Sequence, residues 1–187
     1  MAKKVLVPIA EGFEEIEAVS IIDVLRRAGI EVLVRSLDNT LEVKGANGIT
    51  LKADGALEGL DADAIDMIVL PGGWGGTDRL AEDQNVQSLL KAMDAKGKAI
   101  GAICAAPFAL NAAGVLKEKF TCYPSVEEQI RREGYMADAQ QVVEAQNVMT
   151  SRGPGTAICF GLEIVKKLVG DDTYNALKEG LLATYCE

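Results

Sequence analysis

The chain has 187 residues, a length that suits one domain spanning residues 1–187. Its 19 Lys and Arg against 28 Asp and Glu give a net charge of -9, so we expect no strong binding to nucleic acid or to anionic membranes. Its histidine count of 0 excludes a Ser-His-Asp triad or a Cys-His dyad within the chain and removes the commonest metal ligand, so we expect no metal site.

Strands and helices alternate in the first part of the chain. The apolar, β-branched run at residues 4–9 predicts a strand. An apolar stripe at helical spacing (Ile16, Val19, Ile22, Leu25) predicts a helix over residues 14–28 with this stripe facing inward, and Gly29 ends it. Residues 31–36 predict the next strand. Two short alternating stretches within residues 41–51 flank a Gly-Ala-Asn-Gly turn and predict a small β-hairpin insert beside the main sheet.

The same alternation continues toward the C-terminus. The predicted strands are residues 65–70, 98–103 and 148–150, and the predicted helices are residues 86–96, 105–113, 126–133, 155–169 and 171–182. This order predicts an α/β fold, with a doubly wound, mostly parallel sheet and helices on both faces in a three-layer sandwich. Ligands of such folds bind at the carboxyl ends of the strands, so functional residues are expected there.

Cys104 is the candidate nucleophile. It directly follows the strand that ends at Ile103 and precedes a predicted helix, as in a nucleophile elbow, and the neighbouring Ala105 and Ala106 are as small as such a turn requires. The N-terminus of the following helix is expected to lower the pKa of the thiol. The alternative is a buried structural cysteine.

Glu17 is the candidate acid/base. It lies in the first predicted helix between Ile16 and Ala18, so its carboxyl group is expected to face the protein. Burial there would raise its pKa and let the acid donate a hydrogen bond or shuttle a proton. Glu14 and Glu15 are expected on a solvated helix face, which is also the alternative for Glu17.

Two loops complete the candidate site. Gly72 and Gly73 follow a predicted strand, where their N–H groups could form an oxyanion hole, although a simple turn is the alternative. This loop does not match the phosphate-binding P-loop pattern. Arg152 precedes a predicted helix, where it could bind a carboxylate or hold a neighbouring loop.

The remaining cysteines are expected to be mostly structural. The chain has no C-x-x-C pair, so reduced thiols in a reducing compartment are predicted in place of disulfides. Cys159 is expected to pack on an apolar helix face and Cys186 to lie in a frayed tail, while Cys122 is a weaker candidate for a second redox thiol. Apolar runs far shorter than the roughly 20 residues that cross a bilayer, with no signal-peptide pattern, indicate a cytoplasmic protein.

Four segments together resemble the ThiJ/PfpI family, and within it the branch of the Parkinson-disease-associated protein deglycase. They are residues 12–17 (GFEEIE), 71–73 (PGG), 102–107 (AICAAP) and 150–156 (TSRGPGT), and they occur in order from end to end of the chain. The resemblance implies a flavodoxin-like fold, a homodimer and no cofactor. It also implies that Cys104 is the reactive, oxidisable cysteine, that protonated Glu17 donates a hydrogen bond to it, and that the amides of Gly73 and Ala105 line an oxyanion pocket.

The function implied by the resemblance is that of a cofactor-independent glyoxalase III or deglycase. Its substrates would be methylglyoxal, glyoxal or their early adducts on proteins and nucleotides, with Cys104 as nucleophile and Glu17 as acid/base. Many relatives place a histidine where Tyr123 stands here, so a peptidase is disfavoured, and Tyr123 is expected to border the pocket. The alternatives are a redox-sensing, chaperone-like stress protein that oxidises at Cys104, and a purely structural family member.

Overall fold

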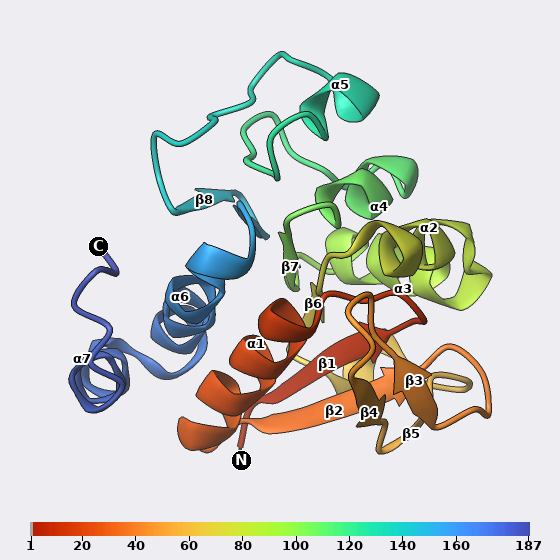
Figure 1. Ribbon diagram of the computed structural model, residues 1–187, viewed down its shortest axis with the longest axis horizontal. Helices are drawn as coiled ribbons and strands as arrows, with labels where there is room; N and C mark the ends of the chain where they lie inside the picture. The colour runs from red at the N-terminus through yellow and green to blue at the C-terminus, as the bar shows by residue number, and fades with distance from the viewer. Residues whose placement is uncertain (1) are drawn as a thin grey trace.

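The protein is described by a computed structural model that covers residues 2–187 (Figure 1). Its main sheet has seven strands in the order β5-β2-β1-β6-β7-β9-β8. In chain order the sheet strands are β1 (Lys4–Ile9), β2 (Glu31–Ser36), β5 (Gly55–Ala56), β6 (Met67–Leu70), β7 (Ala99–Ile103), β8 (Val142–Ala145) and β9 (Val148–Ser151). All neighbouring strands are parallel except β8 and β9, which pair antiparallel.

Helices cover both faces of this sheet. They are α1 (Glu15–Arg27), α2 (Trp74–Glu82), α3 (Gln84–Ala95), α4 (Pro107–Ala112), α5 (Glu127–Ile130), α6 (Ala157–Val169) and α7 (Asp171–Gly180), with short 3-10 turns η1 (Ala62–Ala64) and η2 (Pro154–Thr156). One apolar core joins α1 and α6 to the sheet, and a second joins α2, α3 and α4 to its other face. The predicted doubly wound, three-layer fold is confirmed.

The small hairpin is confirmed as well. Strands β3 (Glu42–Lys44) and β4 (Thr50–Lys52) pair antiparallel outside the main sheet. From β1 the chain passes to β2 on one side and later to β6 on the other, so the strand order switches between β1 and β6 while these strands stay parallel. This switch point is where ligands bind in such folds.

The hairpin also corrects the expectation for Glu15, which is buried rather than solvated. Its carboxylate accepts hydrogen bonds from the backbone N–H groups of Asn47 (2.6 Å) and Ile49 (3.3 Å) and from the Asn47 side chain (3.0 Å). Burial acts to raise the pKa of Glu15, but these hydrogen bonds outweigh it and hold the pKa below its ordinary value. Conversely Ile16, predicted as part of the inward stripe of α1, is 57% exposed.

Three local predictions were wrong. Helix α2, which begins directly after Gly73, was not predicted, and neither were strands β5 and β8. The helix predicted over residues 126–133 is the single turn α5. The glycines of α2 serve close packing: a Cβ on Gly76 would lie 2.9 Å from the backbone nitrogen of Phe13.

A fourth correction concerns the cysteines, because Cys159 and Cys186 form a disulfide. Their separation of 27 residues gives no short motif, and the pairing arises because α7 brings the tail back to α6. Cys186 is therefore buried and not in a frayed tail. Among residues 2–187, no helix is both long and apolar enough to span a membrane.

Candidate active site

Cys104 lies on a strained turn between β7 and α4. Its backbone has φ +64°, a left-handed conformation that is unusual for a residue other than glycine and is typical of nucleophile elbows. The Cys104 N–H donates to the carbonyl oxygen of Ser151 (3.0 Å), and its own carbonyl accepts from the N–H of Tyr123 (2.9 Å). Two neighbouring segments thus hold the turn, and the residue remains 9% exposed.

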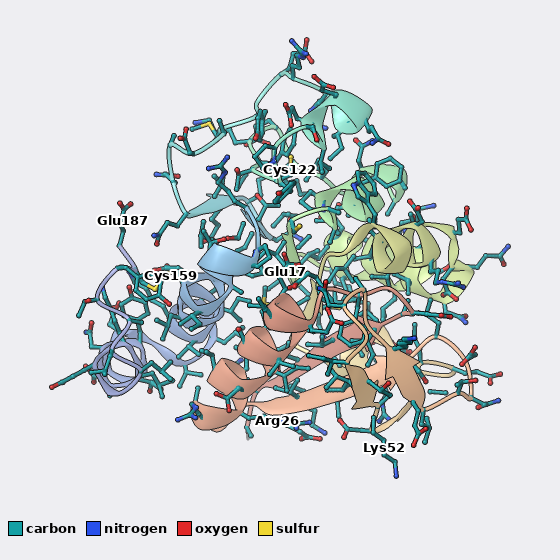
Figure 2. The ribbon with its side chains drawn as sticks, in the orientation of Figure 1. Glu17, Arg26, Lys52, Cys122, Cys159 and Glu187 are labelled. Atoms are coloured by element: carbon teal, nitrogen blue, oxygen red, sulfur yellow. A yellow bond between two sulfur atoms is a disulfide. The ribbon has the colours of Figure 1, made fainter. Side chains whose placement is uncertain are left out.

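Glu17 lies in the first turn of α1 (Figure 2). It is 0% exposed, and its carboxyl group lies close enough to the Cys104 side chain for each group to shift the pKa of the other. Oε2 accepts from the N–H of Gly72 (2.8 Å), while Oε1 is buried without a partner among the described residues. A carboxylate oxygen with no donor favours the neutral acid.

Helix α1 is positioned by its own cap. The side chain of Glu14 accepts from the N–H of Glu17 (2.7 Å), and the N–H of Glu14 donates to the carbonyl of Gly72 (2.9 Å). The start of α1 is therefore tied directly to the loop after β6. This contact fixes Glu17 against Cys104 at the switch point between β1 and β6.

Gly72 fits tightly between the Cys104 and Glu17 side chains, and Gly73 fits tightly against the loop between β1 and α1. A Cβ on Gly72 would lie 2.6 Å from both the Cys104 Cβ and Glu17 Oε2. Gly73 has φ +86° and meets the backbone of the β1–α1 loop, where a Cβ would lie 2.4 Å from the Gly12 carbonyl oxygen. The backbone N–H groups of Gly73 and Ala105 act on the Cys104 thiol and lower its pKa. The sulfur therefore has two backbone amides and one carboxyl group as neighbours.

Burial and mutual repulsion couple the protons of this pair. Burial raises the pKa of Glu17 from an ordinary 4.5 to about 7, although hydrogen bonds from Cys104 and Gly72 act to lower it. The pKa of Cys104 is raised by burial and by a charged Glu17, and the amides of Gly73 and Ala105 only partly offset this. The sequence predicts that the helix N-terminus lowers the pKa of the Cys104 thiol. That prediction is wrong while Glu17 is charged. Because two anions cannot coexist here, the pair retains one shared proton through neutral pH.

Of the two other predicted site residues, Tyr123 contacts Cys104 and Arg152 does not. The backbone of Tyr123 contacts Cys104, while its side chain is 49% exposed and packs against Gly153. The Arg152 guanidinium instead lies near Tyr135 and Cys122, where its charge acts to lower the pKa of both groups. It shows no contact with the Cys104–Glu17 pair.

Cys122 is buried as a second free thiol. Its pKa is raised to about 12 by burial and by the charge of Glu127, which disfavours a reactive thiolate. Sequence reasoning missed Trp74, which follows Gly73, is partly exposed and packs edge-on against Phe108 (centroids 5.7 Å apart). Its position beside an active-site glycine was the one signal in the sequence.

Neither cavity size nor metal ligands define this site. A cavity of about 560 Å³ lies at the ends of β1 and β2, and Cys104 and Glu17 are not among the residues that line it. Within the described part of the chain, no cluster of three or more His, Cys, Asp or Glu could hold a metal ion.

A model of the DJ-1/PfpI family matches residues 3–167. The chain belongs to the DJ-1/PfpI family.

Relatives in this family match nearly the whole chain. Protein dj-1beta of Drosophila melanogaster is 40% identical over 186 residues, 99% of this chain and 100% of that protein. The glutathione-independent glyoxalase DJR-1.2 of Caenorhabditis elegans is 40% identical over 171 residues, 91% of each chain. The crystal structure of Drosophila DJ-1beta has a TM-score of 0.92 at 41% identity, and covers 97% of this chain and 98% of its own. An oxidized DJ-1 of Toxoplasma gondii has a TM-score of 0.88 at 39% identity, with 97% and 98% coverage.

Proposed function

We propose that this protein is a cofactor-independent glyoxalase III or deglycase that acts on methylglyoxal, glyoxal or their early adducts. The observation that carries the proposal is the buried carboxyl group of Glu17 beside the Cys104 side chain: a Cβ on Gly72 would lie 2.6 Å from both Glu17 Oε2 and Cys104 Cβ, and the amides of Gly73 and Ala105 act to lower the thiol pKa. The glyoxalase activity named for the C. elegans relative supports the same reaction class.

The reaction begins with attack of the Cys104 sulfur on the aldehyde carbon of methylglyoxal. The shared proton passes from the pair to the new oxygen, and the product is a hemithioacetal. Glu17 then removes the proton from the carbon bonded to sulfur and returns one to the neighbouring carbon, which gives an enzyme-bound lactoyl thioester. Water hydrolyses this thioester to lactate and regenerates the thiol, so the sequence is redox-neutral and needs no cofactor.

The backbone amides have a defined part in this sequence. The N–H groups of Gly73 and Ala105 act on the Cys104 sulfur, so an oxyanion on the adjacent carbon can accept hydrogen bonds from the same donors. Gly72 orients the Glu17 carboxyl group through its own N–H. The partly exposed Tyr123 borders the entrance, and we give it no proton-transfer role.

The experiment is lactate formation from methylglyoxal by the wild type, Cys104→Ser and Glu17→Gln. Cys104→Ser should abolish turnover, and Glu17→Gln should reduce it by at least about 100-fold, the usual contribution of acid–base catalysis. Glu15→Gln, which removes a buried carboxylate from the same helix but outside the pair, is the matched control and should retain activity. A folded wild type that forms no lactate from methylglyoxal would refute the enzymatic proposal.

The second candidate function is redox sensing through Cys104, with chaperone-like partner binding as the output. It is favoured by one contrast: Cys104 is 9% exposed with two amide donors, whereas Cys122 is 0% exposed. Mild peroxide followed by peptide mapping should oxidise Cys104 before Cys122. Equal oxidation of the two thiols would argue against a sensor.

We also propose a homodimer in the cytoplasm, as the resemblance implies. The exposed apolar side chains of Ile16 and Val19 on α1 and of Ile49 beside the hairpin supply a surface for it. Sedimentation of the wild type and of Ile16→Glu tests this, because the variant should be monomeric. A monomeric wild type would exclude the dimer.

A further inference from the structure

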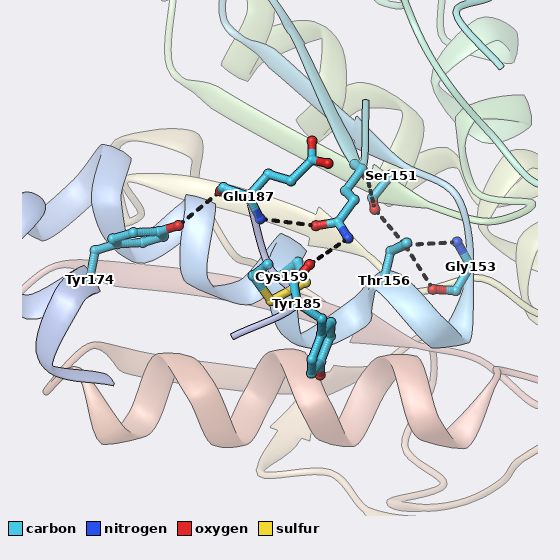
Figure 3. Close-up of a disulfide and its surroundings, with 9 residues drawn as sticks. Ser151, Gly153, Thr156, Cys159, Tyr174, Tyr185 and Glu187 are labelled. Atoms are coloured by element: carbon cyan, nitrogen blue, oxygen red, sulfur yellow. Dashed lines mark hydrogen bonds between the residues drawn. A yellow bond between two sulfur atoms is a disulfide. The ribbon is translucent and has the colours of Figure 1, made fainter. Parts of the chain in front are cut away.

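A disulfide fastens the C-terminal tail to the body of the protein. Cys159 in α6 is bonded to Cys186, the residue before the last (Figure 3). Both cysteines are buried, and neither belongs to the Cys104–Glu17 pair. The disulfide is therefore a redox feature separate from the candidate active site.

Few noncovalent contacts hold the same tail. The hydroxyl of Tyr174 donates to the carbonyl of Glu187 (3.0 Å), and the Gln141 side chain donates to the carbonyl of Tyr185 (3.0 Å) and accepts from the N–H of Glu187 (3.4 Å). The two bonds of Gln141 are exposed and the bond of Tyr174 is part-buried, and each is a single hydrogen bond with a modest net contribution.

The tail also buries little apolar surface. The side chain of Leu182 is 80% exposed and that of Tyr185 is 52% exposed, whereas Ala183 and Cys186 are buried. Ala183 is in addition held by its N–H, which donates to the carbonyl of Lys178 (3.0 Å), so the residues after Ala183 depend most on the S–S bond.

The fastened tail covers one corner of the sheet. Gln141 directly precedes β8, which is an edge strand. Beside it lies a cavity of about 180 Å³ whose lining includes Cys159, Met149 and Glu187. Release of the tail would uncover the Gln141 side chain, this cavity and the Cys159 thiol. The surface at an exposed sheet edge would then change.

The position of Cys104 does not depend on this fastening. The Gln141 carbonyl accepts from the Ser151 hydroxyl (2.7 Å), and the Ser151 carbonyl accepts from the Cys104 N–H. Ser151 is also paired to both β7 and β8, so it stays in place when the tail leaves. The redox state of the tail and the reactivity of Cys104 should therefore vary independently.

We propose that Cys159 and Cys186 form a reversible thiol–disulfide site that latches residues 183–187 according to redox state. In reduction, a dithiol transfers two electrons and two protons; the S–S bond breaks, two cysteine thiols form, and the dithiol becomes a disulfide. In oxidation, the two thiols pass two electrons and two protons to oxidised glutathione, which yields two molecules of glutathione. The proposal does not rest on the enzymatic function.

The test is digestion of the full chain by a carboxypeptidase in two redox states. One sample is oxidised with oxidised glutathione and the other is reduced with dithiothreitol, and both are then alkylated and followed by intact mass. The oxidised chain should retain Cys186, and the reduced chain should lose its last residues at least about tenfold faster, because cleavage follows the population of the open tail. Peptide maps of the oxidised sample should show Cys159 joined to Cys186, with Cys104 and Cys122 unlinked.

Two variants separate the latch from the polar contacts. Cys186→Ser should be digested rapidly in both states. Tyr174→Phe, which removes the hydroxyl bond to Glu187 and keeps the disulfide, should remain resistant when oxidised. The proposal is overturned if oxidised glutathione produces no Cys159–Cys186 peptide, or if oxidised and reduced tails are digested at the same rate.

Discussion

The buried carboxyl group of Glu17 should make the protein less stable as pH rises. The folded state raises the pKa of Glu17 from 4.5 to about 7, so between these values the folded chain retains a proton that the unfolded chain releases. Stability from this group is complete below pH 4.5 and is lost as pH rises through 7. At about 1.4 kcal/mol for each pH unit, the loss amounts to about 3 kcal/mol.

The assay is urea unfolding of the wild type and of Glu17→Gln at pH values from 5 to 8. The difference in unfolding free energy between the two proteins isolates Glu17, because all other groups titrate in both. The wild type should lose about 3 kcal/mol relative to Glu17→Gln across this range.

Glu15→Gln supplies a control of opposite sign on the same helix. The pKa of Glu15 is held below its ordinary value, so its stabilisation is present above pH 4.5 and is lost only as pH falls further. The difference between the wild type and Glu15→Gln should therefore be constant from pH 5 to 8. A constant difference for Glu17→Gln as well would refute the reasoning about a protonated, buried acid.

Three further changes have defined outcomes. Gly72→Ala should reduce turnover at least about tenfold and destabilise the protein by about 1–3 kcal/mol, because the new Cβ would lie 2.6 Å from Cys104 and Glu17. Gly155→Ala is the control: its Cβ would meet nothing within 4 Å, so turnover and stability should both stay unchanged. Cys186→Ser should lower the unfolding free energy by about 3–4 kcal/mol, the chain-entropy value for a loop of 27 residues. A reductant should abolish this difference between the variant and the wild type. Equal stability of the two proteins under oxidising conditions would contradict the prediction. Lys98→Met should lower the free energy of unfolding by about 1–3 kcal/mol, because the ammonium group of Lys98 donates hydrogen bonds to the carbonyls of Ala62 (2.7 Å) and Ile65 (2.8 Å). An unchanged midpoint of thermal or urea unfolding would contradict this.

Local pattern predicted much of the fold because periodicity and burial agreed. Strands β1 and β2 have the predicted bounds, since each is a short β-branched run with a clear glycine or helix boundary. The placement of Cys104 on a turn and of Glu17 in the first turn of a helix also followed from the order of elements. Parallel strand ends then brought the two side chains together.

The errors arose where contacts between distant segments override local signals. Trp74 is followed by two glycines with poor helix propensity, yet α2 forms because Gly76 packs against the backbone at Phe13. Glu15 is buried by the hairpin, whose position no helical pattern reveals. The Cys159–Cys186 bond depends on the turn before α7 and so has no sequence motif.

The central claim is that Cys104 and Glu17 share a proton, and alkylation of Cys104 tests it most directly. The rate of iodoacetamide labelling at Cys104, followed by peptide mapping from pH 5 to 10, is compared for the wild type and Glu17→Gln. The wild type should need a higher pH for half-maximal labelling than Glu17→Gln, because the charged carboxylate of Glu17 raises the pKa of the Cys104 thiol and the variant lacks that charge. Coincident midpoints in the two proteins would contradict the account.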